Sequence, residues 1–136
     1  MAKGENIMDT NMKTIVIDDM MTMRKIIIKM LKQLGFTNLT EADDGATAWP
    51  LIEQAADAGE PFQFIVSDWN MPKMSGLDLL QKIRSDEKLK HTPFLMVTAE
   101  SEQSQVIQVV KAGVSNFVVK PFKPDTLKDK ITKIFS

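Results

Sequence analysis

The chain has 136 residues, of which 43% are hydrophobic and 26% charged, so it is long enough for one globular domain and too short for two. A formal net charge of −1 argues against binding to nucleic acid or an anionic membrane, and apolar runs of about five residues are far below the roughly 20 that a membrane helix needs. The absence of cysteine excludes disulfides, thiolate metal sites and thiol catalysis, and we expect a cytoplasmic protein.

The N-terminal half of the chain alternates predicted strands and helices after a polar start. Residues 1–12 lack the apolar core of a secretion signal, so we predict a flexible tail followed by one domain over residues 13–136. Apolar runs at 14–17 and 39–42 are typical of buried parallel strands. The helix between them ends at Gly35, and its apolar face comprises Met23, Ile26, Ile27, Met30, Leu31 and Leu34.

The second predicted helix, over residues 45–58, contains Pro50. A proline inside a helix removes a backbone donor and crowds the preceding turn. We therefore predict that this helix starts late or kinks.

The same alternation continues in the C-terminal half of the chain. Strands are predicted at 64–66, 94–97 and 117–119, and helices at 76–84, 102–112 and 124–135. The complete pattern is (βα)5. Because right-handed crossovers place helices on both faces of a parallel sheet, we predict an α/β fold with a doubly wound, parallel five-stranded sheet.

Polar side chains follow four of the five predicted strands. Asp18 and Asp19 follow the first strand, Asp68 the third, Thr98 the fourth and Lys120 the fifth. Because the carboxyl ends of parallel strands meet at one edge, these groups should converge there. Two carboxylates about 4 Å apart repel by roughly 4 kcal/mol, so the cluster requires a cation or altered protonation. Oxygen-only ligands favour Mg2+ or another hard cation.

Asp68 is the best placed of these residues for a covalent role, because a carboxylate can act as a nucleophile and form an aspartyl phosphate. Asp18 and Asp19 would hold the metal, while Lys120 neutralises a phosphoryl oxygen and Thr98 donates a hydrogen bond to it. Each residue also has a purely structural interpretation. Asp19 or Thr98 can be a helix cap, Asp68 can begin an Asx turn, and Lys120 can be a surface charge.

Several segments together resemble the receiver domains of two-component response regulators, most closely those of the CheY type. They are IVIDD (15–19), EADDG (41–45), SDWNMPKMSGLDLL (67–80), LMVTAE (95–100) and AGVSNFVVKPF (112–122). The resemblance extends from about Lys13 to the C-terminus. It implies a flavodoxin-like fold with strand order 2-1-3-4-5, and phosphorylation of Asp68 by a sensor histidine kinase.

The resemblance also implies how the site is built. Mg2+ would be ligated by Asp19, Asp68 and the backbone carbonyl of Asn70, with Asp18 acting through water. Lys120 and Thr98 would contact the phosphoryl group, and the bond between Lys120 and Pro121 would be cis. Asn70 and Glu100 flank the site and resemble positions that tune hydrolysis of the acyl phosphate.

The resemblance also implies output through protein binding at a surface that includes Val106 and Lys130. This surface changes when Thr98 and Phe117 rearrange. The resemblance implies a flagellar motor switch protein and a phosphatase as further partners. We expect the domain to be a monomer. Two features depart from the motor-binding pattern. Phe117 stands where a tyrosine is usual, and Glu102 lies in a segment where motor-binding relatives usually carry lysines.

Alternative functions follow from these departures and from the aspartyl nucleophile. A phosphate sink would drain phosphoryl groups from a kinase without contacting the motor. A haloacid-dehalogenase-like phosphatase also uses an aspartyl nucleophile and Mg2+, but needs a second acid two residues later, where this chain has Asn70. A flavodoxin-like cofactor binder would need a hydroxyl- and glycine-rich phosphate loop after the first strand, which is absent.

Overall fold

The computed structural model describes residues 9–99 and 103–136, so Glu100 and Glu102 lie outside the described residues. Its strands are β1 Thr14–Ile17, β2 Leu39–Ala42, β3 Phe64–Asp68, β4 Phe94–Thr98 and β5 Asn116–Val119. Its helices are α1 Met21–Gln33, α2 Gly45–Asp57, α3 Gly76–Arg84, α4 Gln103–Lys111 and α5 Pro124–Phe135. Among these helices none is long and apolar enough to span a membrane.

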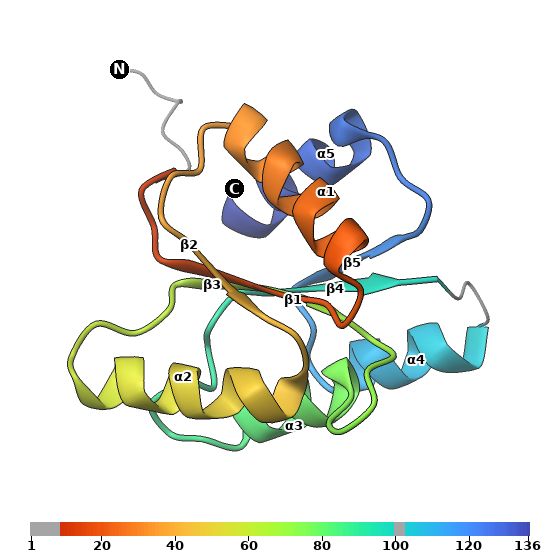
Figure 1. Cartoon of the computed structure of the whole chain (residues 1–136). Coiled ribbons are helices and arrows are strands. Elements are labelled where there is room, and N and C mark those ends of the chain that lie inside the picture. The colour runs from red at the N-terminus through yellow and green to blue at the C-terminus, as the bar shows by residue number, and fades with distance from the viewer. Residues whose placement is uncertain (1–8, 100–102) are drawn as a thin grey trace.

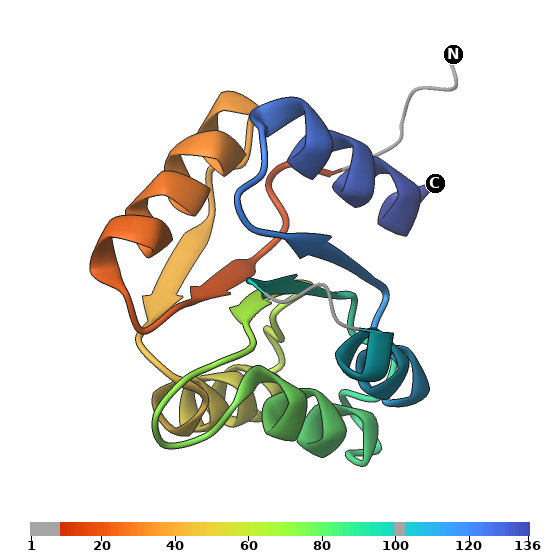
Figure 2. The same cartoon turned by 90° about the vertical axis from the view of Figure 1, so that its right-hand side faces the viewer.

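The five strands form one parallel sheet, as the sequence predicts, and their order β2-β1-β3-β4-β5 is the one that the resemblance to receiver domains implies. Helices α1 and α5 cover one face, and α2, α3 and α4 cover the other (Figures 1 and 2). The chain winds in one direction from β1 to β2 and in the other from β3 onward. This reversal lies between β1 and β3, where ligands bind in doubly wound sheets.

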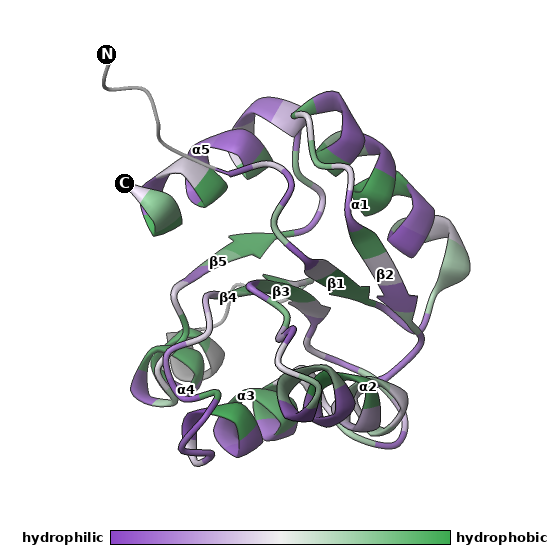
Figure 3. Ribbon diagram, turned by 90° about the vertical axis from the view of Figure 1, so that its left-hand side faces the viewer, coloured by the Kyte–Doolittle hydropathy of each residue, from purple (hydrophilic) through white to green (hydrophobic). Residues whose placement is uncertain are grey.

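Two apolar clusters hold the layers together, one on each side of the sheet. Ile15, Ile17 and Ile65 point to the α2/α3/α4 side, whereas Val16 and Val66 point to the α1/α5 side, and all five are fully buried. This alternation buries both faces of the central strands, as their continuous apolar runs require. In Figure 3 the hydrophobic stripes of the helices accordingly face the strands.

Helix α2 begins at Gly45 and contains Pro50, so the predicted late start is wrong. Asp44 caps the helix, because its side chain accepts a hydrogen bond from the backbone N–H of Thr47 at 2.9 Å. The buried residues Ala48 and Ile52 fix the helix against the sheet. Capping and packing therefore outweigh the single donor that the proline lacks.

The N-terminal segment 9–12, which the sequence assigns to the tail, contacts the domain. Met12 is only 4% exposed and belongs to the apolar cluster on the α1/α5 side. The Thr37 hydroxyl donates a hydrogen bond to the Asn11 side chain at 2.9 Å, and the Thr37 N–H donates to the Thr10 carbonyl at 3.3 Å. We therefore propose that the domain begins before residue 13.

Candidate phosphoryl-acceptor and metal site

The polar residues predicted to converge do so at the carboxyl edge of the sheet. Asp68 and Thr98 are the last residues of β3 and β4, so both strands extend beyond their predicted ends. Asp18 and Asp19 directly follow β1, and Lys120 directly follows β5. Parallel register aligns these strand ends, and the N–H of Lys120 donates to the carbonyl of Thr98 at 2.7 Å.

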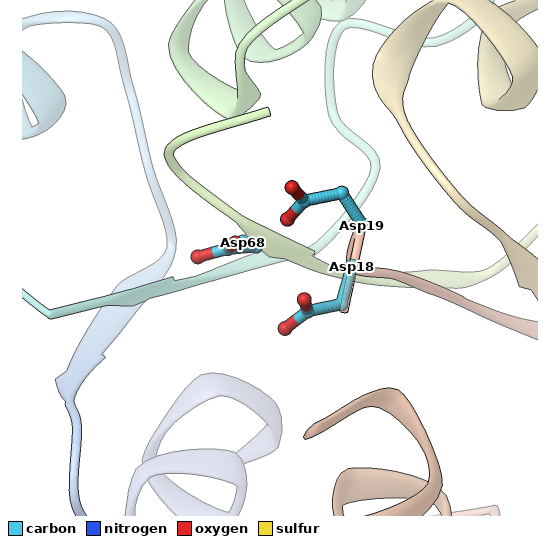
Figure 4. A group of neighbouring side chains, drawn as sticks. All are labelled: Asp18, Asp19 and Asp68. Atoms are coloured by element: carbon cyan, nitrogen blue, oxygen red, sulfur yellow. The ribbon is translucent and has the colours of Figure 1, made fainter. Parts of the chain in front are cut away.

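Three carboxylates form the acidic part of the site. Asp18, Asp19 and Asp68 each offer an oxygen, and these atoms lie within 4.8 Å of one another. Figure 4 shows Asp18 and Asp19 turning to different sides from the end of β1, beside Asp68 on β3. Asp18 and Asp68 are buried, at 0% and 6% exposed, whereas Asp19 is exposed. The cluster is therefore reachable from solvent on the Asp19 side.

Lys120 supplies the positive charge that contacts the buried carboxylates. Its Nζ lies 3.2 Å from Oδ1 of Asp68 and 3.5 Å from Oδ2 of Asp18, and its side chain is 15% exposed. Its bond to Pro121 is cis. A largely buried lysine paired with two buried carboxylates is not a solvated surface charge, so that interpretation is wrong.

The electrostatics of the site leave negative charge uncompensated. Burial raises the pKa of Asp68 from its ordinary value of 3.8 to about 6, and the nearby charge of Asp18 contributes to this rise. Lys120 and a hydrogen bond from the Trp69 N–H oppose the rise without cancelling it. Three carboxylates therefore face one bonded ammonium, which leaves room for a further cation at the site.

This donor set fits a hard divalent cation. All three candidate ligands are carboxylate oxygens, which Mg2+ prefers, and the exposed Asp19 leaves a side open for water or for a phosphate oxygen. Asn70 is exposed in the segment after β3, next to Asp68. A hard cation would also compensate the charge of Asp68, whose pKa is raised mainly by burial and further by the nearby Asp18.

Local hydrogen bonds show which structural interpretations fail. Met20, not Asp19, is the N-cap residue of α1, and no side chain caps that helix. The side chain of Asp68 accepts from the next residue, Trp69, at 2.9 Å, which is not an Asx turn. Asp18 makes the bond of that type, accepting from the Met20 N–H at 2.9 Å. The helix cap proposed for Thr98 falls on a segment outside the described residues.

Two residues that support the site were missed by the sequence analysis. Arg24 of α1 donates from Nη1 to the backbone carbonyl of Asp18 at 2.7 Å. Gly76 approaches the backbone of β3 so closely that an added Cβ would overlap the Asp68 carbonyl oxygen and lie 2.8 Å from Sδ of Met96. The sequence offered only weak signals for them: Arg24 is a basic residue soon after the acid pair, and Gly76 stands at the start of a predicted helix.

The residues predicted for output lie apart from the carboxylates, on α4, β5 and α5. Phe117 and Val106 are half-buried, and Nζ of Lys130 lies 5.4 Å from the centre of the Phe117 ring. A pocket beside them is lined by residues that include Phe117, Phe122, Lys123 and Lys130. Thr98 is 3% exposed at the end of β4, between this region and the carboxylates.

Comparison with known proteins gives one consistent result. The family described as the response regulator receiver domain matches residues 14–132. Chemotaxis protein CheY-3 of Vibrio cholerae is 50% identical over 131 residues, covering 96% of this chain and 97% of the relative. Chemotaxis protein CheY of Pseudomonas aeruginosa is 53% identical over 124 residues, covering 91% and 96%.

Solved structures agree with this result. Vibrio cholerae chemotaxis protein CheY4 superposes with a TM-score of 0.79 at 30% identity, covering 92% of this chain and 99% of the other. The receiver domain of a histidine kinase from Syntrophus aciditrophicus gives a TM-score of 0.78 at 20% identity, covering 90% and 88%, and supports the fold alone.

Proposed function

Because the chain belongs to the response regulator receiver family, we propose that Asp68 accepts a phosphoryl group from a phosphohistidine of a sensor kinase. The observation that carries the proposal is the position of Asp68, a buried carboxylate held 3.2 Å from Nζ of Lys120 within a cluster of oxygen ligands. The pKa of about 6 leaves Asp68 mainly ionised at neutral pH, as a nucleophile must be.

The transfer assigns a separate task to each group. A carboxylate oxygen of Asp68 forms a bond to phosphorus while the bond between phosphorus and the histidine nitrogen breaks, and that nitrogen keeps the electron pair. Lys120 neutralises a phosphoryl oxygen, and the hydroxyl of Thr98 donates to another. Asn70 and Glu100 tune the later hydrolysis of the acyl phosphate by controlling access of water. A phosphatase would act on this hydrolysis step.

The proposed cation site uses side chains from two neighbouring strands. Asp19, Asp68 and the backbone carbonyl of Asn70 would hold Mg2+, with Asp18 acting through a bound water. When bound, Mg2+ supplies charge neutralisation at the phosphoryl oxygens. The hydrogen bond from Met20 and the ion pair with Lys120 keep both oxygens of Asp18 oriented.

Labelling with acetyl phosphate tests the acceptor. In the presence of Mg2+ the protein should gain about 80 Da, the mass of one phosphoryl group, on Asp68, and chelation with EDTA should prevent the gain. Asp68→Asn should remove the label because an amide is not a nucleophile of this kind. Equal labelling of Asp68→Asn, located by peptide mapping, would contradict the assignment.

Output is proposed to occur by phosphorylation-dependent binding to a flagellar motor switch protein, since both curated relatives above are chemotaxis proteins. The surface would comprise Val106, Phe117 and Lys130, with Thr98 linking it to the phosphoryl group. A phosphate sink is the second candidate. It is favoured by Phe117, whose ring has no hydroxyl to bond a partner.

A binding measurement separates these two outputs. The protein labelled by acetyl phosphate is titrated with a peptide from a motor switch protein, and a motor-binding regulator should bind it at least tenfold more tightly than the unlabelled protein does. Lys130→Ala should weaken that binding, because it removes a cation from the surface. Affinity that does not change on labelling would leave the sink as the output.

A further inference from the structure

Arg24 bridges the metal-site turn to the edge strand of the sheet. Its Nη1 donates to the backbone carbonyl of Asp18 at 2.7 Å, and its Nε donates to Oε1 of Glu41, on β2, at 2.8 Å. The side chain is 15% exposed, so it is largely shielded from water. One planar guanidinium therefore holds two groups from neighbouring strands in a fixed relation.

Glu41 is itself held in place as an ionised partner. Lys25 donates to its Oε2 at 2.7 Å, and hydrogen bonds from Lys25 and Arg24 lower the pKa of Glu41 below its ordinary value. The N–H of Asp18 also donates to the carbonyl of Ala42, the residue after Glu41, at 3.2 Å. Both ends of the Arg24 bridge are thus anchored to β2.

The carbonyl that Arg24 holds belongs to the peptide unit joining Asp18 to Asp19. Rotation of that unit would turn the Cα–Cβ bond of Asp19, because a peptide unit moves as a plane. The buried Asp18 carboxylate is fixed by Met20 and Lys120, but Asp19 is exposed, and no described residue donates a hydrogen bond to its carboxylate. The direction of Asp19 therefore depends on the backbone.

We propose that Arg24 is a positioning residue, which sets the direction of the Asp19 carboxylate toward the cation by holding the Asp18 carbonyl. The inference rests on the proposed magnesium site. Hydrogen bonds outside the ligand shell typically change metal affinity by about 10–100-fold when they are removed.

Electrostatics and positioning predict opposite results when Arg24 is removed. Loss of a positive charge near an acidic site should strengthen the binding of a dication, because repulsion decreases. Loss of the bridge should weaken binding, because Asp19 is no longer directed. Lys25 is the matched control, since it lies next in the same helix and pairs with the same Glu41, but forms no hydrogen bond or ion pair with Asp18 among the described residues.

The test measures Mg2+ affinity by the emission of Trp69, which lies beside Asp68, in a Trp49→Phe background. We expect Arg24→Ala to raise the Mg2+ dissociation constant by about tenfold or more, and Lys25→Ala to leave it unchanged or lower it. Arg24→Lys preserves the charge but cannot bridge both acceptors, so it should also bind Mg2+ more weakly. This variant keeps the test valid if the alanine variant fails to fold.

Labelling by acetyl phosphate gives a second readout. In Arg24→Ala the half-saturating Mg2+ concentration should rise, while the rate at saturating Mg2+ stays within about twofold of the parent, since Asp68 and Lys120 are untouched. Unchanged or tighter Mg2+ binding in both Arg24 variants would overturn the inference and leave the proposed function intact. A parent protein that binds no Mg2+ would instead overturn the proposed function.

Discussion

Asp68→Asn is expected to raise the free energy of unfolding of the metal-free protein by up to about 3 kcal/mol at pH 8, although it removes the proposed phosphoryl acceptor. The pKa of Asp68 is raised from 3.8 to about 6, and each unit of difference corresponds to about 1.4 kcal/mol. Because the folded protein binds this proton more tightly than the unfolded chain does, ionisation of Asp68 destabilises the fold.

The sign of the pH dependence follows from the same shift. At pH 4 Asp68 is protonated in the folded protein and close to its ordinary pKa of 3.8 in the unfolded chain, so the substitution should have little effect there. The stabilisation should grow between pH 4 and 6 and be complete above the folded-state pKa. Urea unfolding in EDTA at pH 4 and pH 8 measures both ends of this range.

A matched control separates this effect from the loss of any surface charge. Asp57 is 72% exposed and pairs with Lys88 at 3.3 Å, so Asp57→Asn should change stability by less than about 0.5 kcal/mol at either pH. Saturating Mg2+ should stabilise the parent more than Asp68→Asn, since a bound cation compensates the charge of Asp68, which asparagine lacks. A loss of stability in Asp68→Asn at pH 8 would contradict the charge argument.

The residues at the carboxyl edge of the sheet were predictable because their positions follow from the order of residues along the chain. Apolar runs locate the strands, parallel strands end at one edge, and the residue after each run must lie there. The order of residues along the chain is therefore enough to bring Asp18, Asp68 and Lys120 together. The resemblance to receiver domains added the strand order and the cis bond at Pro121, and the structure confirms both.

Other features depend on how elements dock, which no local pattern encodes. The Arg24 side chain reaches two strands only because α1 packs at a particular angle on the sheet. Helix α2 tolerates Pro50 because Asp44 and the buried face hold it, so tertiary packing overrides local propensity. The burial of Met12 likewise depends on contacts distant in sequence.

Lys120→Met should produce the largest loss of stability, about 3 to 5 kcal/mol in the metal-free protein at pH 7. Methionine preserves much of the unbranched stem but removes the ammonium that lies 3.5 Å from Oδ2 of Asp18 and 3.2 Å from Oδ1 of Asp68. Asp18 is completely buried, so its charge would be left without the ammonium and could not be hydrated. Urea unfolding in EDTA measures the loss, and the exposed Lys123→Met is the control, with a change below about 0.5 kcal/mol.

Magnesium and a second substitution distinguish the two roles of Lys120. Saturating Mg2+ should recover much of the stability that Lys120→Met loses, because another cation compensates the carboxylates. Labelling by acetyl phosphate should nevertheless remain about 100-fold or more slower than in the parent, because no ammonium contacts the phosphoryl oxygens. The double variant Asp68→Asn/Lys120→Met should be more stable than Lys120→Met alone, since one buried charge fewer lacks a partner. If the double variant is the less stable of the two, Lys120 acts by packing and the carboxylates are not short of positive charge.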